Sequence, residues 1–272
     1  MDDRFKRFPR DLAERSRTLR LAGVPALLCH PDWKTRAPVV LWMHGRTVNK
    51  ELDPGRYLRW VRAGIAACAI DLPGHGERYI EEYQGPGRTL DMLEQVDREI
   101  DGVLDALFDG ETGEVFDRDR MGIGGMSAGG MATLVRLCRP HRFRCAAVEA
   151  TTGSLRTMYF DRDGAWPVNH DPARVARLDP VQRLDGFRPI PLLALHAEAD
   201  RVVPVESQRA FVASLREHYT SAGSSPDLVE MHTWADTGAP EEHAGFGRYS
   251  NDAKNVQVEF LARHLGATPI GW

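Results

Sequence analysis

The segment Gly125-Met126-Ser127-Ala128-Gly129 has the pattern G-x-S-x-G and lies between an apolar strand pattern and a helical pattern. A serine at such a tight turn occupies a strained backbone conformation, and small neighbours are needed where the strand and the helix nearly touch. The turn also directs the first N–H groups of the helix towards any negative charge that forms at the serine. We therefore expect Ser127 to be a nucleophile. The alternative is a serine that only caps the helix over 128–138.

Strand and helix patterns alternate along all 272 residues, which is typical of a mainly parallel sheet covered by helices on both faces. The segment 38–43 is apolar on both faces, as expected for the interior of such a sheet. Periodicity is lost over 151–187. We therefore predict an α/β fold in a single domain, residues 1–272, with a cap insertion at about 151–187. Strands are predicted over 18–29 (a pair), 38–43, 64–71, 120–124, 143–148, 190–196 and 227–233, and helices over 53–64, 90–108, 128–138, 205–219 and 249–265.

Charge and composition exclude several classes of partner. The formal net charge is -4 with basic and acidic residues interspersed, so we expect no nucleic-acid partner. No apolar run approaches the ~20 residues that span a bilayer, so we expect no membrane partner. The four cysteines form no C-x-x-C pair and lie mostly in apolar patterns, which predicts reduced core residues in a cytoplasmic protein and no metal site. The sequence leaves the oligomeric state open, a homo-oligomer included.

A serine hydroxyl is a poor nucleophile at neutral pH, so an imidazole must accept its proton and a carboxylate must orient that imidazole. Asp200 follows the strand over 190–196 and precedes a helix that starts at a proline. His243 alone among the ten histidines follows the last strand and precedes the last helix. The chain order Ser127, Asp200, His243 therefore predicts a catalytic triad. The alternatives are an acid that only favours a helix start, Glu198 as the acid, or a solvent-exposed loop histidine.

Acyl transfer also needs donors for the tetrahedral oxyanion. We expect the backbone N–H groups of Ala128 and Arg46 to provide them, because Ala128 follows the nucleophile and His44-Gly45 lets the chain pass close to it. The Arg46 side chain is expected to be a surface charge, or else to bind a substrate carboxylate. His44 and His75 are expected to brace their loops. The substrate-binding candidates are Met126, Met158, Tyr159, Phe160 and Trp166.

Five motifs in this order resemble the α/β-hydrolase superfamily over nearly the whole chain from about residue 20. The likeness is closest to the branch that contains dienelactone hydrolases, small bacterial carboxylesterases and the catalytic domains of prolyl oligopeptidases. A serine nucleophile resembles that of the esterases and peptidases of the branch. We expect no propeller domain of the prolyl oligopeptidase type in these 272 residues, which argues against a peptidase. The motifs are His44-Gly45, Asp71-Leu72-Pro73-Gly74-His75-Gly76, the Ser127 pentapeptide, Asp200 with Val203-Pro204, and His243-Ala244-Gly245-Phe246.

These observations predict a serine esterase that cleaves small-molecule esters of short or medium acyl chains through an acyl-Ser127 intermediate. This chemistry requires neither a metal nor an organic cofactor. The same triad would serve an acyl-peptide or amide hydrolase, or an acyltransferase. A more remote alternative is a non-catalytic binding protein on a hydrolase scaffold.

Overall fold

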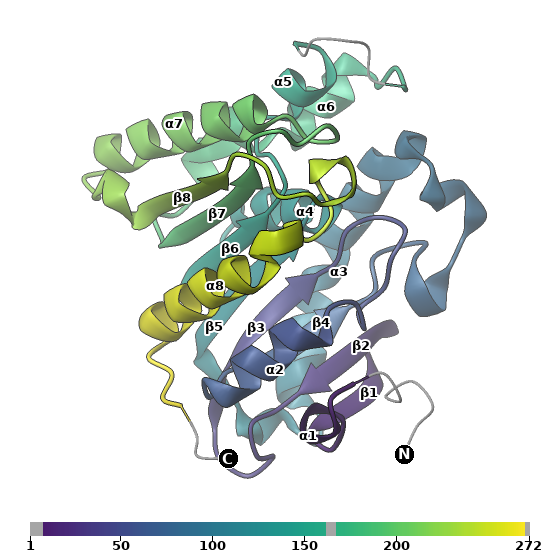
Figure 1. Cartoon of the computed structure of the whole chain (residues 1–272), viewed down its shortest axis with the longest axis vertical. Coiled ribbons are helices and arrows are strands. Elements are labelled where there is room, and N and C mark those ends of the chain that lie inside the picture. Colours follow the sequence, from purple (N-terminus) through teal and green to yellow (C-terminus); the bar gives the residue numbers. More distant parts are fainter. Residues whose placement is uncertain (1–7, 162–166, 270–272) are drawn as a thin grey trace.

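The computed structural model describes residues 8–161 and 167–269. All its named strands belong to one eight-stranded sheet with the order β1-β2-β4-β3-β5-β6-β7-β8 (Figure 1). The predicted α/β sheet is confirmed. The strands are β1 (Ser16–Leu21), β2 (Val24–Cys29), β3 (Ala37–Met43), β4 (Ala66–Ile70), β5 (Phe116–Met126), β6 (Cys145–Glu149), β7 (Leu192–Ala197) and β8 (Val229–Trp234).

The sheet is antiparallel at one edge and parallel elsewhere. The hairpin β1–β2 matches the predicted strand pair over 18–29, and β2 also runs antiparallel to β4. From β4 through β3, β5, β6 and β7 to β8, every neighbouring pair is parallel. Every residue of β3, β4, β6 and β7 is buried. The doubly apolar pattern therefore reflects strands that are covered on both faces.

Two groups of helices cover the sheet, each with its own apolar core. One core contains buried side chains of α1 (Arg10–Ala13), α2 (Pro54–Arg62) and α8 (Ser250–Leu265). The other contains those of α3 (Thr89–Asp109), α4 (Ala128–Leu137) and α7 (Val205–Ser221). In Figure 1, α2 and α8 lie in front of the sheet and α3 lies behind it. No helix in the described part of the chain is long and apolar enough to cross a membrane.

The segment 151–187 contains two short helices, α5 (Leu155–Tyr159) and α6 (Pro172–Leu178), and a 3-10 segment (Pro180–Gly186). The Asp179 carboxylate accepts hydrogen bonds from the N–H groups of Leu155 (2.8 Å) and Arg156 (3.1 Å) at the start of α5. Arg174 of α6 donates to Glu94 of α3 at 3.0 Å. Contacts between residues distant in sequence therefore hold the described part of this segment. Its helices have only five and seven residues, too few to give a clear helical period in the sequence.

Candidate active site

Ser127 lies between β5 and α4 with φ 52° and ψ -118°, a conformation that is uncommon for a residue with a side chain. Three hydrogen bonds hold it there. Its N–H donates to the Glu149 carbonyl at 2.8 Å, and its carbonyl accepts from the Met131 N–H at 2.9 Å and from the Thr151 hydroxyl at 2.7 Å. The strain is therefore imposed by β6, by α4 and by the residues that follow β6.

The two glycines of the pentapeptide occupy positions that exclude any side chain. A Cβ atom on Gly125 would lie 2.4 Å from the carbonyl carbon of Gly129. A Cβ atom on Gly129 would lie 2.2 Å from the carbonyl oxygen of Met43, at the end of β3. The spacing G-x-S-x-G thus follows from the close approach of strand and helix that was inferred from the sequence.

A continuous hydrogen-bonded chain links the three residues singled out in the sequence. Nε2 of His243 lies 2.9 Å from Oγ of Ser127, and Nδ1 of His243 lies 2.7 Å from Oδ2 of Asp200. Because an ionised carboxylate only accepts hydrogen bonds, Nδ1 carries the proton and Nε2 accepts from the serine hydroxyl. The Asp200 side chain is fully buried and that of His243 is 12% exposed. This geometry allows the imidazole to remove the hydroxyl proton of Ser127.

Backbone donors fix the orientation of the Asp200 carboxylate. Its Oδ1 accepts hydrogen bonds from the N–H groups of Val202 and Val203, both at 2.8 Å. Oδ2 is therefore the oxygen that faces His243. Glu198, the alternative acid, instead receives a hydrogen bond from Arg209 at 2.6 Å on the surface.

His196, the penultimate residue of β7, contacts the same carboxylate. Its Nε2 donates to the Val203 carbonyl at 2.9 Å and lies 3.4 Å from Oδ2 of Asp200. Burial lowers the pKa of His196 below its usual value, so the ring is neutral near pH 7. The sequence analysis gave this histidine no role in the site. Its position four residues before Asp200 was the only available signal.

The loop that carries His243 is held in place by the preceding residue. The Glu242 carboxylate accepts hydrogen bonds from the N–H (2.6 Å) and hydroxyl (2.6 Å) of Thr237 and from the N–H of Gly238 (2.7 Å). The carbonyl of Glu241 accepts from the N–H of Arg201, next to Asp200, at 3.0 Å. These bonds connect the His243 loop to the Asp200 loop.

The loop after β3 passes directly beside the serine. A Cβ atom on Gly45 would lie 3.4 Å from Cβ of Ser127. Within the described residues, the N–H groups of Arg46 and Ala128 donate to no protein acceptor. The Arg46 side chain is half-buried rather than a free surface charge, and its Nη1 donates to the Gln84 carbonyl at 3.0 Å. Burial lowers the pKa of Arg46.

His44 and His75 each hold a backbone turn. Nε2 of His44 accepts from the Leu72 N–H at 3.0 Å, so its Nδ1 carries the proton and donates to the Gly45 carbonyl at 2.6 Å. Burial lowers the pKa of His44 to about 4, which keeps the ring neutral. Nδ1 of His75 lies 2.8 Å from the Pro73 carbonyl oxygen.

Two cavities lie near Ser127, one lined by Ser127 itself and one lined by Gly45, Met126 and Ala244, and the predicted pocket residues divide between them. Met158 and Tyr159 line the first together with Ser127 itself. Met126 lines the second. Phe160 is 41% exposed and lines neither of these cavities. Trp166 lies outside the described residues.

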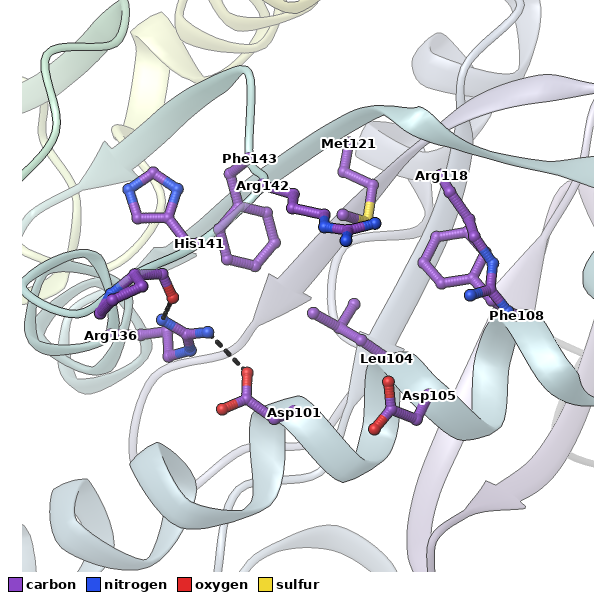
Figure 2. A pocket seen from close by; sticks show the side chains of 11 residues that line it. Asp101, Leu104, Asp105, Phe108, Arg118, Met121, Arg136, His141, Arg142 and Phe143 are labelled. Carbon is purple, nitrogen blue, oxygen red and sulfur yellow. Dashed lines mark hydrogen bonds and ion pairs between the residues drawn. The ribbon is translucent and has the colours of Figure 1, made fainter.

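A larger cavity, of about 640 Å³, lies away from these residues (Figure 2). It is formed by the first half of β5, the second half of α3 and the connection from α4 to β6. Figure 2 shows Arg136 directed towards Asp101, to which it donates at 2.5 Å. Because Ser127 follows the opposite end of β5, this cavity is remote from the Ser127–His243–Asp200 chain.

Comparisons with known proteins show the family of the chain. A model of the prolyl oligopeptidase family matches residues 57–268. The chain is 26% identical over 257 residues to the esterase YjfP of Escherichia coli (strain K12), covering 90% of this chain and 97% of that protein.

Solved structures share the fold. TT1662 from Thermus thermophilus superposes with a TM-score of 0.65 at 23% identity, over 93% of this chain and 99% of that chain. A puromycin-hydrolyzing peptidase of Mycobacterium tuberculosis superposes with a TM-score of 0.73 at 19% identity, over 94% of this chain and 40% of that chain. Both likenesses describe the α/β architecture rather than the substrate.

Proposed function

We propose a reaction on the premise that this chain belongs to the prolyl oligopeptidase family of serine hydrolases. The reaction is hydrolysis of carboxylic esters with Ser127 as nucleophile, His243 as base and Asp200 as the orienting carboxylate. The observation that carries the proposal is the pair of hydrogen bonds at 2.9 and 2.7 Å that joins the three side chains.

Acylation follows from the positions of the protons. Oγ of Ser127 forms a bond to the ester carbonyl carbon while Nε2 of His243 takes the hydroxyl proton. When the tetrahedral intermediate collapses, the bond from carbon to the alkoxy oxygen breaks, and Nε2 returns the proton to that oxygen. An alcohol leaves and an acyl-Ser127 ester remains.

Deacylation repeats the sequence with water as the nucleophile. Nε2 takes a proton from the water, whose oxygen bonds to the acyl carbon, and then protonates Oγ as the carboxylic acid departs. Throughout, the buried Asp200 carboxylate stabilises the imidazolium. The N–H groups of Ala128 and Arg46 are the proposed donors to the oxyanion, since both lie beside Ser127 without a protein acceptor in the described part of the chain.

The choice of ester over amide rests on the comparison with relatives. The relative that is matched over 97% of its own length is an esterase. The peptidase from Mycobacterium tuberculosis is matched over 40% of its length. An ester also needs less assistance in expelling its leaving group, because an alkoxide leaves more readily than an amide anion. The ester is therefore the proposed substrate class.

A fluorophosphonate probe and a pair of chromogenic substrates test the proposal. We expect the probe to label the protein at Ser127, and kcat/KM for p-nitrophenyl acetate to exceed that for an acyl p-nitroanilide. The Ser127→Ala variant should resist labelling and lose nearly all turnover. Absence of labelling would favour a non-catalytic role. Preference for the anilide would favour an amide hydrolase, and product formed only with added alcohol would favour an acyltransferase.

A further inference from the structure

The two cavities beside Ser127 differ strongly in size. The first is lined by Met158, Tyr159 and Val202, among others, and has a volume of about 20 Å³. The second, which we call the Trp42 cavity, has a volume of about 370 Å³ and is lined by Trp42, Val48, Leu52, Met126 and Ala244, among others. A cavity needs roughly 10 to 15 Å³ to hold a water molecule, and a cavity of about 150 Å³ holds a benzene molecule. The first cavity therefore accepts a methyl-sized group, whereas the Trp42 cavity accepts an aromatic ring.

The walls of the Trp42 cavity are suited to an apolar ligand. Five of its lining side chains, those of Trp42, Val48, Leu52, Met126 and Ala244, are apolar. Trp42 is 3% exposed, and the guanidinium of Arg56 lies over its ring at 4.4 Å from the centroid. The indole is therefore held in a fixed orientation, and the larger exposed apolar area comes from Leu52, which is 45% exposed.

The charged groups at this cavity neutralise one another. Arg56 donates to both carboxylate oxygens of Glu149, at 2.6 and 2.8 Å. The ammonium of Lys254 lies 3.2 Å from the Asp53 carboxylate and donates to the Ser250 hydroxyl at 2.6 Å. An ionised ligand would therefore find no unpaired counter-charge here. The cavity favours a neutral group.

The position of His243 indicates which part of an ester faces the Trp42 cavity. His243 must protonate the departing oxygen, so the alcohol part has to lie on the histidine side of Ser127. Ala244 and Gly245, which directly follow His243, line the Trp42 cavity. Ala128 and Arg46, the proposed oxyanion donors, line the smaller one.

We infer that the Trp42 cavity binds the alcohol part of the substrate. The natural substrates are then esters of a short acyl group, of acetyl size, with a bulky and uncharged alcohol that carries an aromatic or branched apolar group. This inference rests on the proposed ester hydrolysis and adds the division of the substrate between the two cavities.

Two isomeric esters separate the two cavities directly. 2-Phenylethyl acetate and ethyl phenylacetate have the same atomic composition, but the ring belongs to the alcohol in the first and to the acyl group in the second. We expect kcat/KM to be at least tenfold higher for 2-phenylethyl acetate, within the range of about 10- to 200-fold that apolar pockets provide. Equal values, or a preference for ethyl phenylacetate, would overturn the inference while leaving ester hydrolysis intact.

Variants of the lining residues test whether the preference between the two esters arises in the Trp42 cavity. Leu52→Trp and Val48→Trp each place a large ring at the Trp42 cavity, and either should bring the ratio of the two kcat/KM values close to one. Leu19→Trp is the matched control, because Leu19 is also partly exposed, at 36%, but lies on β1 at the far edge of the sheet. The control should keep the wild-type ratio. An unchanged ratio in both cavity variants would exclude the Trp42 cavity.

Binding of the alcohol provides a readout that does not need turnover. In the Ser127→Ala background, 2-phenylethanol should give a saturation-transfer NMR signal that disappears when Leu52→Trp or Val48→Trp is added. A signal that survives both additions would contradict the inference. If the proposed esterase activity itself failed, the probe would not label Ser127 and neither isomer would be hydrolysed, whereas the binding result would still report on the cavity.

Discussion

His196 and Asp200 are in contact: Nε2 of His196 lies 3.4 Å from Oδ2 of Asp200, the oxygen that also receives the hydrogen bond from His243. Since the same N–H group donates to the Val203 carbonyl, the tautomer of His196 is defined and the positive end of its N–H dipole faces the carboxylate. We expect His196 to position the Asp200 carboxylate.

His196→Leu should therefore lower kcat about fivefold, as expected for the loss of ~1 kcal/mol of hydrogen bonding, with little change in KM. His196→Gln, which can place an N–H group near the same position, should restore part of the lost kcat. Steady-state kinetics checks both variants, and an unchanged kcat in His196→Leu would remove this role.

The backbone strain at Ser127 predicts that two inactive variants differ in stability. Ser127→Gly should be more stable than Ser127→Ala by about 1 kcal/mol, because glycine adopts a φ of 52° without the cost that alanine keeps. Both variants should be inactive. Urea unfolding of the two proteins measures the difference, and equal midpoints would mean that the turn stores no strain.

Asp200→Asn should lower kcat by about 10⁴-fold, the order of loss seen when an acid that orients a catalytic histidine becomes an amide. Asparagine can donate to Nδ1 and thereby favours the tautomer that cannot accept the serine proton. Glu198→Gln is the matched control, since Glu198 faces Arg209 instead of His243, and should keep kcat within about twofold. Steady-state kinetics with p-nitrophenyl acetate checks both, and a large loss in the control would reassign the acid.

The bonds made by Glu242 predict that the loop, and not only the imidazole, is needed for turnover. Glu242→Gln replaces an acceptor of three hydrogen bonds by a group that cannot accept all of them equally well, so we expect kcat to fall by about tenfold as His243 loses its fixed position. Glu241→Gln, which keeps the backbone carbonyl bonded to Arg201, is the control and should have wild-type kcat. Identical kcat values for the two variants would show that the loop needs no such brace.

Two histidines with lowered pKa values predict a loss of stability in weak acid. Burial lowers the pKa of His44 and of His141 to about 4, with Arg188 and Arg136 adding to the effect at His141. Both pKa values lie below the unfolded value of 6.5, so between pH 6.5 and 4 the unfolded chain binds protons that the folded protein does not. The free energy of unfolding is therefore unaffected by these two rings above pH 6.5 and decreases as the pH falls towards 4.

His141→Phe should therefore reduce the proton uptake on unfolding by about one proton between pH 6.5 and 4. Chemical unfolding at pH 7, 6, 5 and 4 gives the slope of the unfolding free energy against pH for the wild type and the variant. Equal slopes for the wild type and the variant would contradict the assignment of this proton uptake to His141.

Local patterns in the sequence were sufficient for the layered fold and for the order of the three residues. Strands such as β3 are apolar on both faces because both faces are covered, and helices such as α3 show one apolar stripe, so each can be recognised in isolation. In a parallel sheet the residues that follow the strands gather at one edge, which is why Ser127, Asp200 and His243 were predicted to lie together.

Only the tertiary structure decided the features that depend on contacts across the chain. Asp179 bonds to the start of α5 from 24 residues away, Glu242 braces the His243 loop, and His196 reaches Asp200 through a turn. The unequal cavities beside Ser127 likewise arise from segments as distant as 42–56 and 244–254. The sequence by itself thus determined the elements and the chemistry of their ends, because these depend on neighbouring residues. The shape of the site depends on distances between side chains that sequence neighbours do not specify.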